Sequence, residues 1–593
     1  MRRSKALATV ATSALLVTLA ACGGGSGDGD GDTGTDNKFR DAAETIDKDP
    51  ERQGPAAPIE GATEGGTITV LLPDDPGPED LDPTNGWSVT GNSIQQALTH
   101  RSLTQYARDE ESGEMVLVPD LAEDLGQPNE DYTEWTFTIR DNATWQTGDP
   151  ITAEEVAWGI QRSLDSEAFP SGPGTEYSKH YFAGANDYAG PYSDKGKKYD
   201  AITFDNDART VTIKMESPFP DMDYWGAFMA MGPAPLGKAS NPPAYGTEPV
   251  SNGPYKVESF RPSEELVLVR NDAWVPESDP ARHQYADKWI FKFTEDPTQA
   301  DELILSGNEA SETTLSTGIN AENYNQLKTE LGERMVQQSS QCTSFWSPDY
   351  TKITDLNVRK ALAYAYPYES VWQASGEVAG VTRVPANSVM PPGMAGKSDY
   401  QVDGEQITFQ PEKALELLEE AGYAAGEYQI TMAYAEGSPT TEAAQEQITK
   451  GLQDSGFKVK AIPVPIETSL YTIWTDPSNK INKQLNLRGV NWCSDWPSGL
   501  TMLPALLRTD ATYNTSFFSE ESVDARMDEI PTLPADEQAA AWGELDETIA
   551  TEFYPLIPTA FRNDLFTFGT KIGNPTGDGA LGAPNYKDLY VIQ

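Results

Sequence analysis

Histidine and cysteine, which often act in catalysis or bind transition metals, are few in this sequence. Its 593 residues include three histidines, His100, His180 and His283, which lie far apart. There is no His-Glu-x-x-His motif and no paired Cys/His spacing of the kind that holds zinc. A Gly-x-Ser-x-Gly turn, which would present a serine nucleophile, is also absent. The sequence therefore supports neither a zinc site nor a serine hydrolase.

Two other patterns could suggest chemistry, and neither is specific. Residues 393–398, Gly-Met-Ala-Gly-Lys-Ser, end like a phosphate-binding loop, but Pro391 stands where the first glycine is required. The chain has 92 Asp and Glu residues, so chance pairs of carboxylates are certain and a pair alone indicates nothing. We expect no catalytic residues, no metal site and no cofactor.

The cysteines are more informative than the histidines. Cys22 follows Leu-Ala-Ala, and before it come the basic residues Arg2, Arg3 and Lys5 and an apolar run over 6–20. The run is too short to span a bilayer comfortably, so residues 1–21 read as a signal peptide. Its end resembles the lipobox of bacterial lipoproteins, in which the cysteine is diacylated. Two acyl chains would hold the protein on the outer face of the bacterial cytoplasmic membrane.

Two cysteines remain after Cys22, Cys342 and Cys493. In an exported protein two cysteines favour one disulfide, with two buried free thiols as the alternative.

Residues 22–64 are rich in Gly, Ser, Asp, Pro and Ala and lack apolar periodicity, which predicts a flexible tether. The formal net charge of -49 repels phosphates, so nucleic-acid binding is excluded.

The local patterns predict a mixed α/β protein of more than one lobe, because 593 residues exceed one compact core. Strands are expected at 65–72 and 135–140, and a hairpin at 201–213. Helices are expected from the N-cap Thr152, with Glu155 completing a capping box, and over residues 411–421 and 441–455. An alternating strand should follow at 457–462, and no internal repeat is evident.

From Gly65 to the C-terminus, several segments have the order and motifs of one known family. They are Trp135–Leu164 with its Gly148-x-Pro150-x-Thr152-Ala153 core, Asn252–Val257 with Val267–Asn271, Asp355–Leu362, Ala414–Tyr423 and Asn585–Tyr590. On these segments the chain resembles the oligopeptide- and dipeptide-binding proteins of ABC importers, the family 5 extracellular solute-binding proteins. The resemblance covers nearly the whole chain after the tether.

The most specific match is the segment 491–497, Asn-Trp-Cys-Ser-Asp-Trp-Pro. It resembles the Trp-Cys-x-Asp-Tyr segment of the oligopeptide-binding branch. The resemblance implies that Cys493 pairs with Cys342 and that Asp495 receives the α-ammonium of a peptide. A buried ammonium must be paired, and a carboxylate gives it a strong charge-assisted contact. The alternative for Asp495 is a solvated turn before Pro497.

Neighbouring residues complete the expected site. Asn491 and Cys493 belong to the binding segment itself, and aromatic residues would supply apolar walls or else pack in the core: Phe345, Trp346, Trp492 and Trp496. Arg488 is the candidate for a ligand carboxylate, although it lies one residue from the family's arginine and would point to the other face of a strand. Thr147 before Gly148 and Pro367-Tyr368 after the 355–362 helix also depart from the family's pattern.

The resemblance implies an α/β fold of the periplasmic-binding-protein type (type II, cluster C), a two-lobe clamp with three sub-domains and mixed sheets. Domain I would comprise residues 65–104, 230–341 and 555–593, domain II residues 105–229, and domain III residues 342–554. The lobes would close on an extended peptide, held largely by main-chain hydrogen bonds.

The function implied is that of a lipid-anchored, monomeric binding protein which captures oligopeptides and delivers them to the permease of an ABC importer. An oligosaccharide, an opine or a metal chelate remains an alternative ligand for the same fold. A secreted hydrolase and an adhesive surface lipoprotein are alternatives of other classes, and the missing nucleophile and base motifs disfavour the first.

Overall fold

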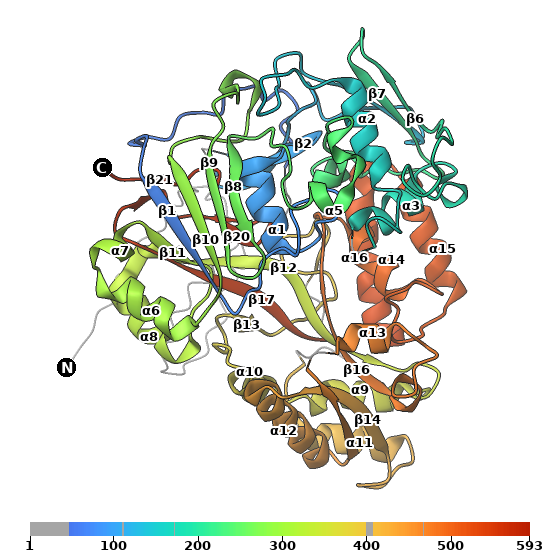
Figure 1. Cartoon of the computed structure of the whole chain (residues 1–593). Helices are drawn as coiled ribbons and strands as arrows, with labels where there is room; N and C mark the ends of the chain where they lie inside the picture. Colours follow the sequence, from blue (N-terminus) through green and yellow to red (C-terminus); the bar gives the residue numbers. More distant parts are fainter. Residues whose placement is uncertain (1–46, 110–111, 171, 399–406, 467) are drawn as a thin grey trace, which may run out of the picture. The chain divides into compact units, whose positions relative to one another are not determined.

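The largest sheet joins strands from both ends of the chain (Figure 1). The structure, a computed structural model, describes residues 47–109, 112–170, 172–398, 407–466 and 468–593. Within them the sheet has the order β16-β12-β17-β11-β1-β10-β9-β8, with β13 beside β17. Its strands are β1 (Thr67–Pro73), β8 (Tyr255–Arg261), β9 (Glu265–Arg270), β10 (Lys288–Glu295), β11 (Thr314–Ser316), β12 (Met335–Pro348), β13 (Arg383–Val384), β16 (Leu487–Cys493) and β17 (Ile557–Phe568).

β1 is a central strand, and it forms where a strand is expected. It runs parallel to both β10 and β11, whereas the other pairs in this sheet are antiparallel. The chain enters β1 through Gly65 and Gly66, whose positive φ angles of 111° and 84° suit glycine. Ile68, Val70 and Leu72 then alternate into a core with Trp289 and Phe291. The parallel neighbours make this a mixed sheet.

β12 and β17 are the long strands of the sheet, with 14 and 12 residues. They pair antiparallel along most of their length, with shifts in register after Ser339 and Ser344. Figure 1 shows them running from the β1 side of the sheet toward the helices drawn below it. β16 pairs with the far edge of β12 and is the end strand of the sheet.

A second region of the described chain contains a four-stranded sheet with the order β4-β5-β7-β6. β4 is Gln127–Pro128, and β5 (Glu134–Thr138) lies near the strand expected at 135–140. The predicted hairpin is present as β6 (Ile202–Asp205) and β7 (Thr210–Lys214). Helix α2 (Ala153–Arg162) begins at Thr152 with the predicted capping box, since Thr152 Oγ1 accepts from the Glu155 N–H and Glu155 accepts from the Thr152 N–H. Its apolar residues, among them Val156 and Ile160, enter the large core.

A βαβ unit forms a third region, and its helix and its second strand lie where the sequence predicts them. β14 (Gln429–Glu436) and β15 (Lys458–Pro465) are parallel and are connected by α12 (Pro439–Asp454). The other helices of at least five residues in the described ranges are α1 (Val89–Ile94), α6 (Pro297–Ser306), α8 (Tyr324–Leu331), α9 (Leu356–Ala365), α10 (Tyr368–Ala374), α11 (Pro411–Glu420), α13 (Leu470–Trp474), α14 (Leu503–Leu507), α15 (Glu521–Glu529) and α16 (Ala535–Thr548), with π-helical turns at Gln95–Thr99 and Ile549–Phe553.

Folded contacts begin before the expected boundary at residue 65. Residues 47–64 contact the folded protein instead of behaving as a tether: Lys48 Nζ lies 2.6 Å from Asp223 Oδ2, and the Asp49 N–H donates to Leu117 O at 2.9 Å. The composition of this segment could not predict these contacts, because they are made by polar side chains and main-chain groups and do not require buried apolar residues. The predicted signal peptide and Cys22 lie outside the described residues. In the part of the chain that is described, every helix is too short or too polar to cross a membrane.

Candidate ligand-binding site

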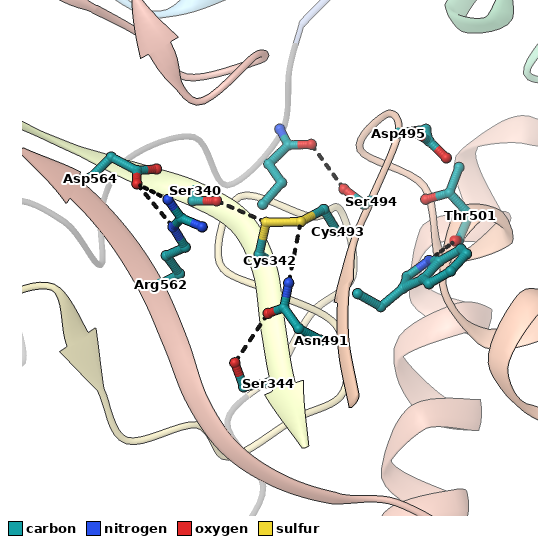
Figure 2. The surroundings of a disulfide bond; sticks show 12 residues. Ser340, Cys342, Ser344, Asn491, Cys493, Ser494, Asp495, Thr501, Arg562 and Asp564 are labelled. Carbon is teal, nitrogen blue, oxygen red and sulfur yellow. Dashed lines mark hydrogen bonds and ion pairs between the residues drawn. A yellow bond between two sulfur atoms is a disulfide. The ribbon is translucent and has the colours of Figure 1, made fainter. Parts of the chain in front are cut away.

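A disulfide holds the C-terminal end of β16 against β12 (Figure 2). Cys342 and Cys493 lie directly opposite each other in the antiparallel register, with their Cα atoms 3.9 Å apart. The next residue is fixed as well, because the Ser494 N–H donates to Gln341 O at 2.8 Å and Ser494 Oγ donates to Gln341 Oε1. The pairing of Cys342 with Cys493 that the resemblance implies is thus present, and it fixes the strand immediately before Asp495.

Asp495 is where three distant segments of the chain meet. Trp87 Nε1 donates to Asp495 Oδ1 at 2.9 Å, and the Tyr177 hydroxyl donates to Oδ2. Trp87 lies in the turn before α1, and Tyr177 lies between a 3-10 turn at Pro173–Thr175 and the short helix α3 (Ser178–Tyr181). Each carboxylate oxygen accepts one of these bonds and keeps capacity for another. The carboxylate can therefore accept further N–H groups without losing either contact.

The carboxylate of Asp495 has no cationic partner among the described residues. Burial raises its pKa to about 6, although the hydrogen bonds from Tyr177 and Trp87 act in the opposite direction and part of the residue still reaches solvent. Half-buried Glu176 lies near Asp495, and burial together with the charge of Asp495 raises the pKa of its carboxyl. An incoming cation would relieve the cost of holding these charges away from water.

Aromatic rings surround the carboxylate. The Tyr177 ring packs against Trp496 and Trp225, with centroid distances of 4.6 and 5.0 Å, and against Trp87 at 6.3 Å. On the β16 side, the Trp492 ring lies 4.6 Å from the half-buried Tyr513 ring. Such rings keep water away from a carboxylate and present negative faces to a cation.

The edge of β16 is open beside this carboxylate. Hydrogen-bonding positions alternate along an antiparallel strand. Since the Ser494 N–H bonds to Gln341, the N–H and C=O of Asn491 point away from β12, toward the open edge. There they meet the hydroxyl of Tyr471, which accepts from the Asn491 N–H at 2.9 Å and donates to Asn491 O. The Asn491 side chain bonds to Ser344 Oγ at 3.1 Å.

The structure places most of the expected aromatic walls in the core. Phe345, Trp346 and Trp496 are 1%, 3% and 1% exposed, and Trp496 Nε1 donates to Asp221 Oδ2 at 2.8 Å. Phe345 and Trp346 pack in the core, because adjacent positions on β12 point to opposite, covered faces of the sheet. Trp496 is also buried in the core, where it contacts the Tyr177 ring. Trp492 is half-buried beside Tyr513, and its Nε1 donates to Thr501 O at 2.9 Å.

Arg488 lies away from the open edge. Its guanidinium is fully buried, 3.2 Å from Asp349 Oδ2, and its Nε donates to Asn482 Oδ1 at 2.9 Å. A buried cation that is already paired has little to offer a ligand carboxylate, so the expected contact is corrected to a structural ion pair. The even position of Arg488 on β16 puts its side chain on the face opposite to that of Asn491 and Cys493.

Three residues of the site carried no signal in the sequence: Trp87, Tyr177 and Tyr471. They stand in turns or short helices without a recognisable motif, and Trp87 and Tyr177 are 408 and 318 residues from Asp495 along the chain. The resemblance to the Trp-Cys-x-Asp-Tyr segment could locate Asp495, but its donors come from elsewhere in the fold.

A polar cavity of about 480 Å³ opens beyond the carboxyl ends of β1 and β11, where Asp74, Asp75 and Thr317 line it. β1 is parallel to neighbours on both sides, and ligands of open α/β sheets often bind at such a point. Arg383 and Arg562 also line the cavity, but each is paired, with Glu377 and Asp564 at 2.7 Å. The cavity is therefore acidic overall. No cluster of potential metal ligands occurs within the described ranges.

The raised pKa of Asp495 predicts a pH dependence for the binding of any ammonium ligand. Below about pH 6 the ligand-free carboxyl is protonated, so binding must expel a proton. Affinity for a peptide with a free amino terminus should fall by up to about tenfold per unit as the pH drops below 6, and change little between pH 6.5 and 7.5. Isothermal titration calorimetry from pH 4.5 to 7.5 measures this. The same slope in an Asp495→Asn variant would assign it to another group.

The arrangement can be compared with known proteins. A family model for bacterial extracellular solute-binding proteins, family 5 (middle), matches residues 116–514. The chain is 23% identical over 483 residues to the periplasmic oligopeptide-binding protein OppA of Salmonella typhimurium, which covers 78% of this chain and 83% of that protein. It is also 23% identical over 534 residues to the dipeptide-binding protein DppE of Bacillus subtilis, covering 87% and 90% of the two chains.

Solved structures confirm the predicted fold class. Clavulanic acid biosynthesis oligopeptide binding protein 2 matches with a TM-score of 0.79 and 21% identity, over 92% of this chain and 99% of that one. Haemophilus influenzae OppA in complex with the peptide RPPGFSPFR matches with a TM-score of 0.68 and 19% identity, over 90% and 100%. The fold is the mixed α/β clamp of these binding proteins. The chain therefore belongs to family 5 of the bacterial extracellular solute-binding proteins, a family of transporter binding proteins and not of enzymes.

Proposed function

We propose that this protein binds oligopeptides outside the cytoplasm and delivers them to an ABC importer. The observation that carries the proposal is the carboxylate of Asp495, which has aromatic surroundings and two hydrogen-bond donors but no cation among the described residues. A peptide's α-ammonium supplies the missing positive charge. Its N–H groups fit the acceptor capacity that remains on the two carboxylate oxygens.

The open edge of β16 suits the rest of such a ligand. An extended peptide can add to a free sheet edge through main-chain hydrogen bonds, which do not depend on its side chains. Asp495 follows this edge directly, so a peptide with its amino terminus at Asp495 runs back along β16, antiparallel to it. The carboxylate favours a peptide over an oligosaccharide or a metal chelate, since a ligand without an amine leaves Asp495 unpaired. An opine carries an amine but no extended main chain that could pair with the edge of β16.

We also propose that the protein is a monomer anchored by a diacylated Cys22 after removal of residues 1–21. The basic start, the apolar run and the Leu-Ala-Ala-Cys sequence support this. In this proposal residues 65–104, 230–341 and 555–593 form domain I, residues 105–229 form domain II and residues 342–554 form domain III. The intact mass of the mature protein tests the anchor, because an unmodified residue 22 would exclude it.

Mass spectrometry of ligands released on denaturation tests the proposed function. The protein is purified from its own cell envelope without peptide-containing buffers, then denatured, and the filtrate is analysed. Peptides of a few residues with free amino termini are the expected result. Recovery of saccharides or metal chelates in stoichiometric amount, with no peptide, would contradict the proposal. The Asp495→Asn variant is the matched control and should release much less peptide.

A further inference from the structure

The hydroxyl of Tyr471 is hydrogen-bonded to both the N–H and the C=O of Asn491 at the open edge of β16. It accepts a hydrogen bond from the Asn491 N–H at 2.9 Å and donates one to Asn491 O. Tyr471 stands on the short helix α13, and its half-buried ring packs edge-on against Trp474 with a centroid distance of 5.4 Å. Burial raises the pKa of Tyr471 to about 12, so the hydroxyl remains protonated and can act as donor and acceptor at neutral pH.

This pair of bonds has the pattern of a neighbouring strand. In an antiparallel sheet, a residue whose N–H and C=O point to one side exchanges both bonds with a single residue of the next strand. One hydroxyl is among the few side-chain groups that can satisfy the donor and the acceptor together. Nothing else in the described structure pairs with this part of β16, since β16 is the end strand of its sheet.

We propose that the Tyr471 hydroxyl is a placeholder for the ligand's main chain, and that a bound peptide must displace it to pair with Asn491. This inference rests on the proposed function. It makes Tyr471 a residue that sets affinity: its two bonds satisfy the strand edge when no ligand is bound, and each peptide must first break them. The aromatic ring can turn aside with α13 while the hydroxyl is replaced by one N–H and one C=O of the ligand.

The register of the ligand on β16 determines which of its residues must pair with Asn491 and displace the Tyr471 hydroxyl. Cys493 is two residues from Asn491 and is the outward-pointing position of β16 nearest Asp495. A ligand antiparallel to β16 with its amino terminus at Asp495 would therefore have its first residue opposite Cys493. Outward-pointing positions repeat every two residues, so its third residue lies opposite Asn491. That residue must offer both an N–H and a C=O. Proline or an N-methylated residue there would leave the Asn491 carbonyl without a donor, whereas the second residue is free of this demand.

The experiment compares Tyr471→Phe with the intact protein, using tetra-alanine with a free amino terminus as the probe in calorimetry at pH 7. The variant keeps the ring and removes the hydroxyl. Because the ligand no longer has to break the two bonds, tetra-alanine should bind about threefold to tenfold more tightly. Tyr324→Phe is the matched control, since Tyr324 lies on α8, where its ring contacts Lys328, and this variant should bind tetra-alanine with unchanged affinity.

Two further measurements separate the possible results. Amide hydrogen exchange of Asn491 without ligand should be faster in Tyr471→Phe than in the intact protein, and equally slow in both once tetra-alanine is bound. Tetra-alanine methylated on the nitrogen of its third residue should bind at least tenfold more weakly than the form methylated on its second. Equal or weaker binding of tetra-alanine by Tyr471→Phe would overturn the placeholder role and leave the proposed function standing. Failure of the intact protein to bind any free tri- to pentapeptide would overturn both.

Discussion

Asp495→Asn should weaken the binding of a free-amino peptide about a hundredfold. The substitution keeps the size of the side chain and an acceptor for Trp87 or Tyr177, but it removes the charge that compensates the ligand's ammonium. Breaking a desolvated pair by removing one partner costs on the order of 3 kcal/mol, which corresponds to that loss of affinity. Calorimetry with tetra-alanine at pH 7 measures it. The variant should fold normally, because the ligand-free carboxylate has no cationic partner to lose among the described residues.

N-acetylated tetra-alanine provides the second half of this test. Acetylation removes the ammonium, as Asp495→Asn removes the carboxylate, so the two changes delete one interaction. The acetylated peptide should bind the intact protein and the variant with similar, low affinity, and the double change should cost little more than either alone. If the intact protein bound free and acetylated peptides equally well, Asp495 would not be the ammonium site, and a saccharide or a chelate would become the better candidate.

Replacing both Cys342 and Cys493 with serine should produce the largest loss of stability among simple changes to this chain. The bridge closes a loop with a sequence separation of 151 residues. In the chain-entropy account, a cross-link over about 150 residues stabilises the fold by roughly 5 kcal/mol at 25 °C, as an upper guide. Calorimetric or circular-dichroism melting should find the transition lowered. Peptide affinity should fall as well, since the bridge holds the strand end that precedes Asp495.

The reduced intact protein is the control for the cysteine variant. Dithiothreitol should lower the transition of the intact protein to that of the serine variant and leave the variant unchanged. An unchanged transition in the double variant would mean that β12 and β16 are held by their hydrogen bonds and packing alone. Free-thiol labelling of both cysteines in the native protein would show that the disulfide does not form.

The sequence by itself determined the local elements and the family. The capping box of Thr152 and Glu155, the β6–β7 hairpin and the helices α11 and α12 are present where short-range patterns predict them. The reason is that caps, turns and amphipathic spacing act between residues only a few positions apart. The segment around Cys493 likewise located the disulfide, because its motif resembles one whose pairing is known.

Only the tertiary structure decided what surrounds these residues. Trp87 and Tyr177 reach Asp495 across 408 and 318 positions of sequence, Asp349 neutralises Arg488 from the end of another strand, and Tyr471 covers the edge of β16. Residues 47–64, whose composition predicts a tether, contact the folded protein through polar and main-chain groups. Each of these contacts depends on the register and the facing of strands that are distant in sequence. A shift of one residue would exchange the two faces of β16, so local patterns could not specify them.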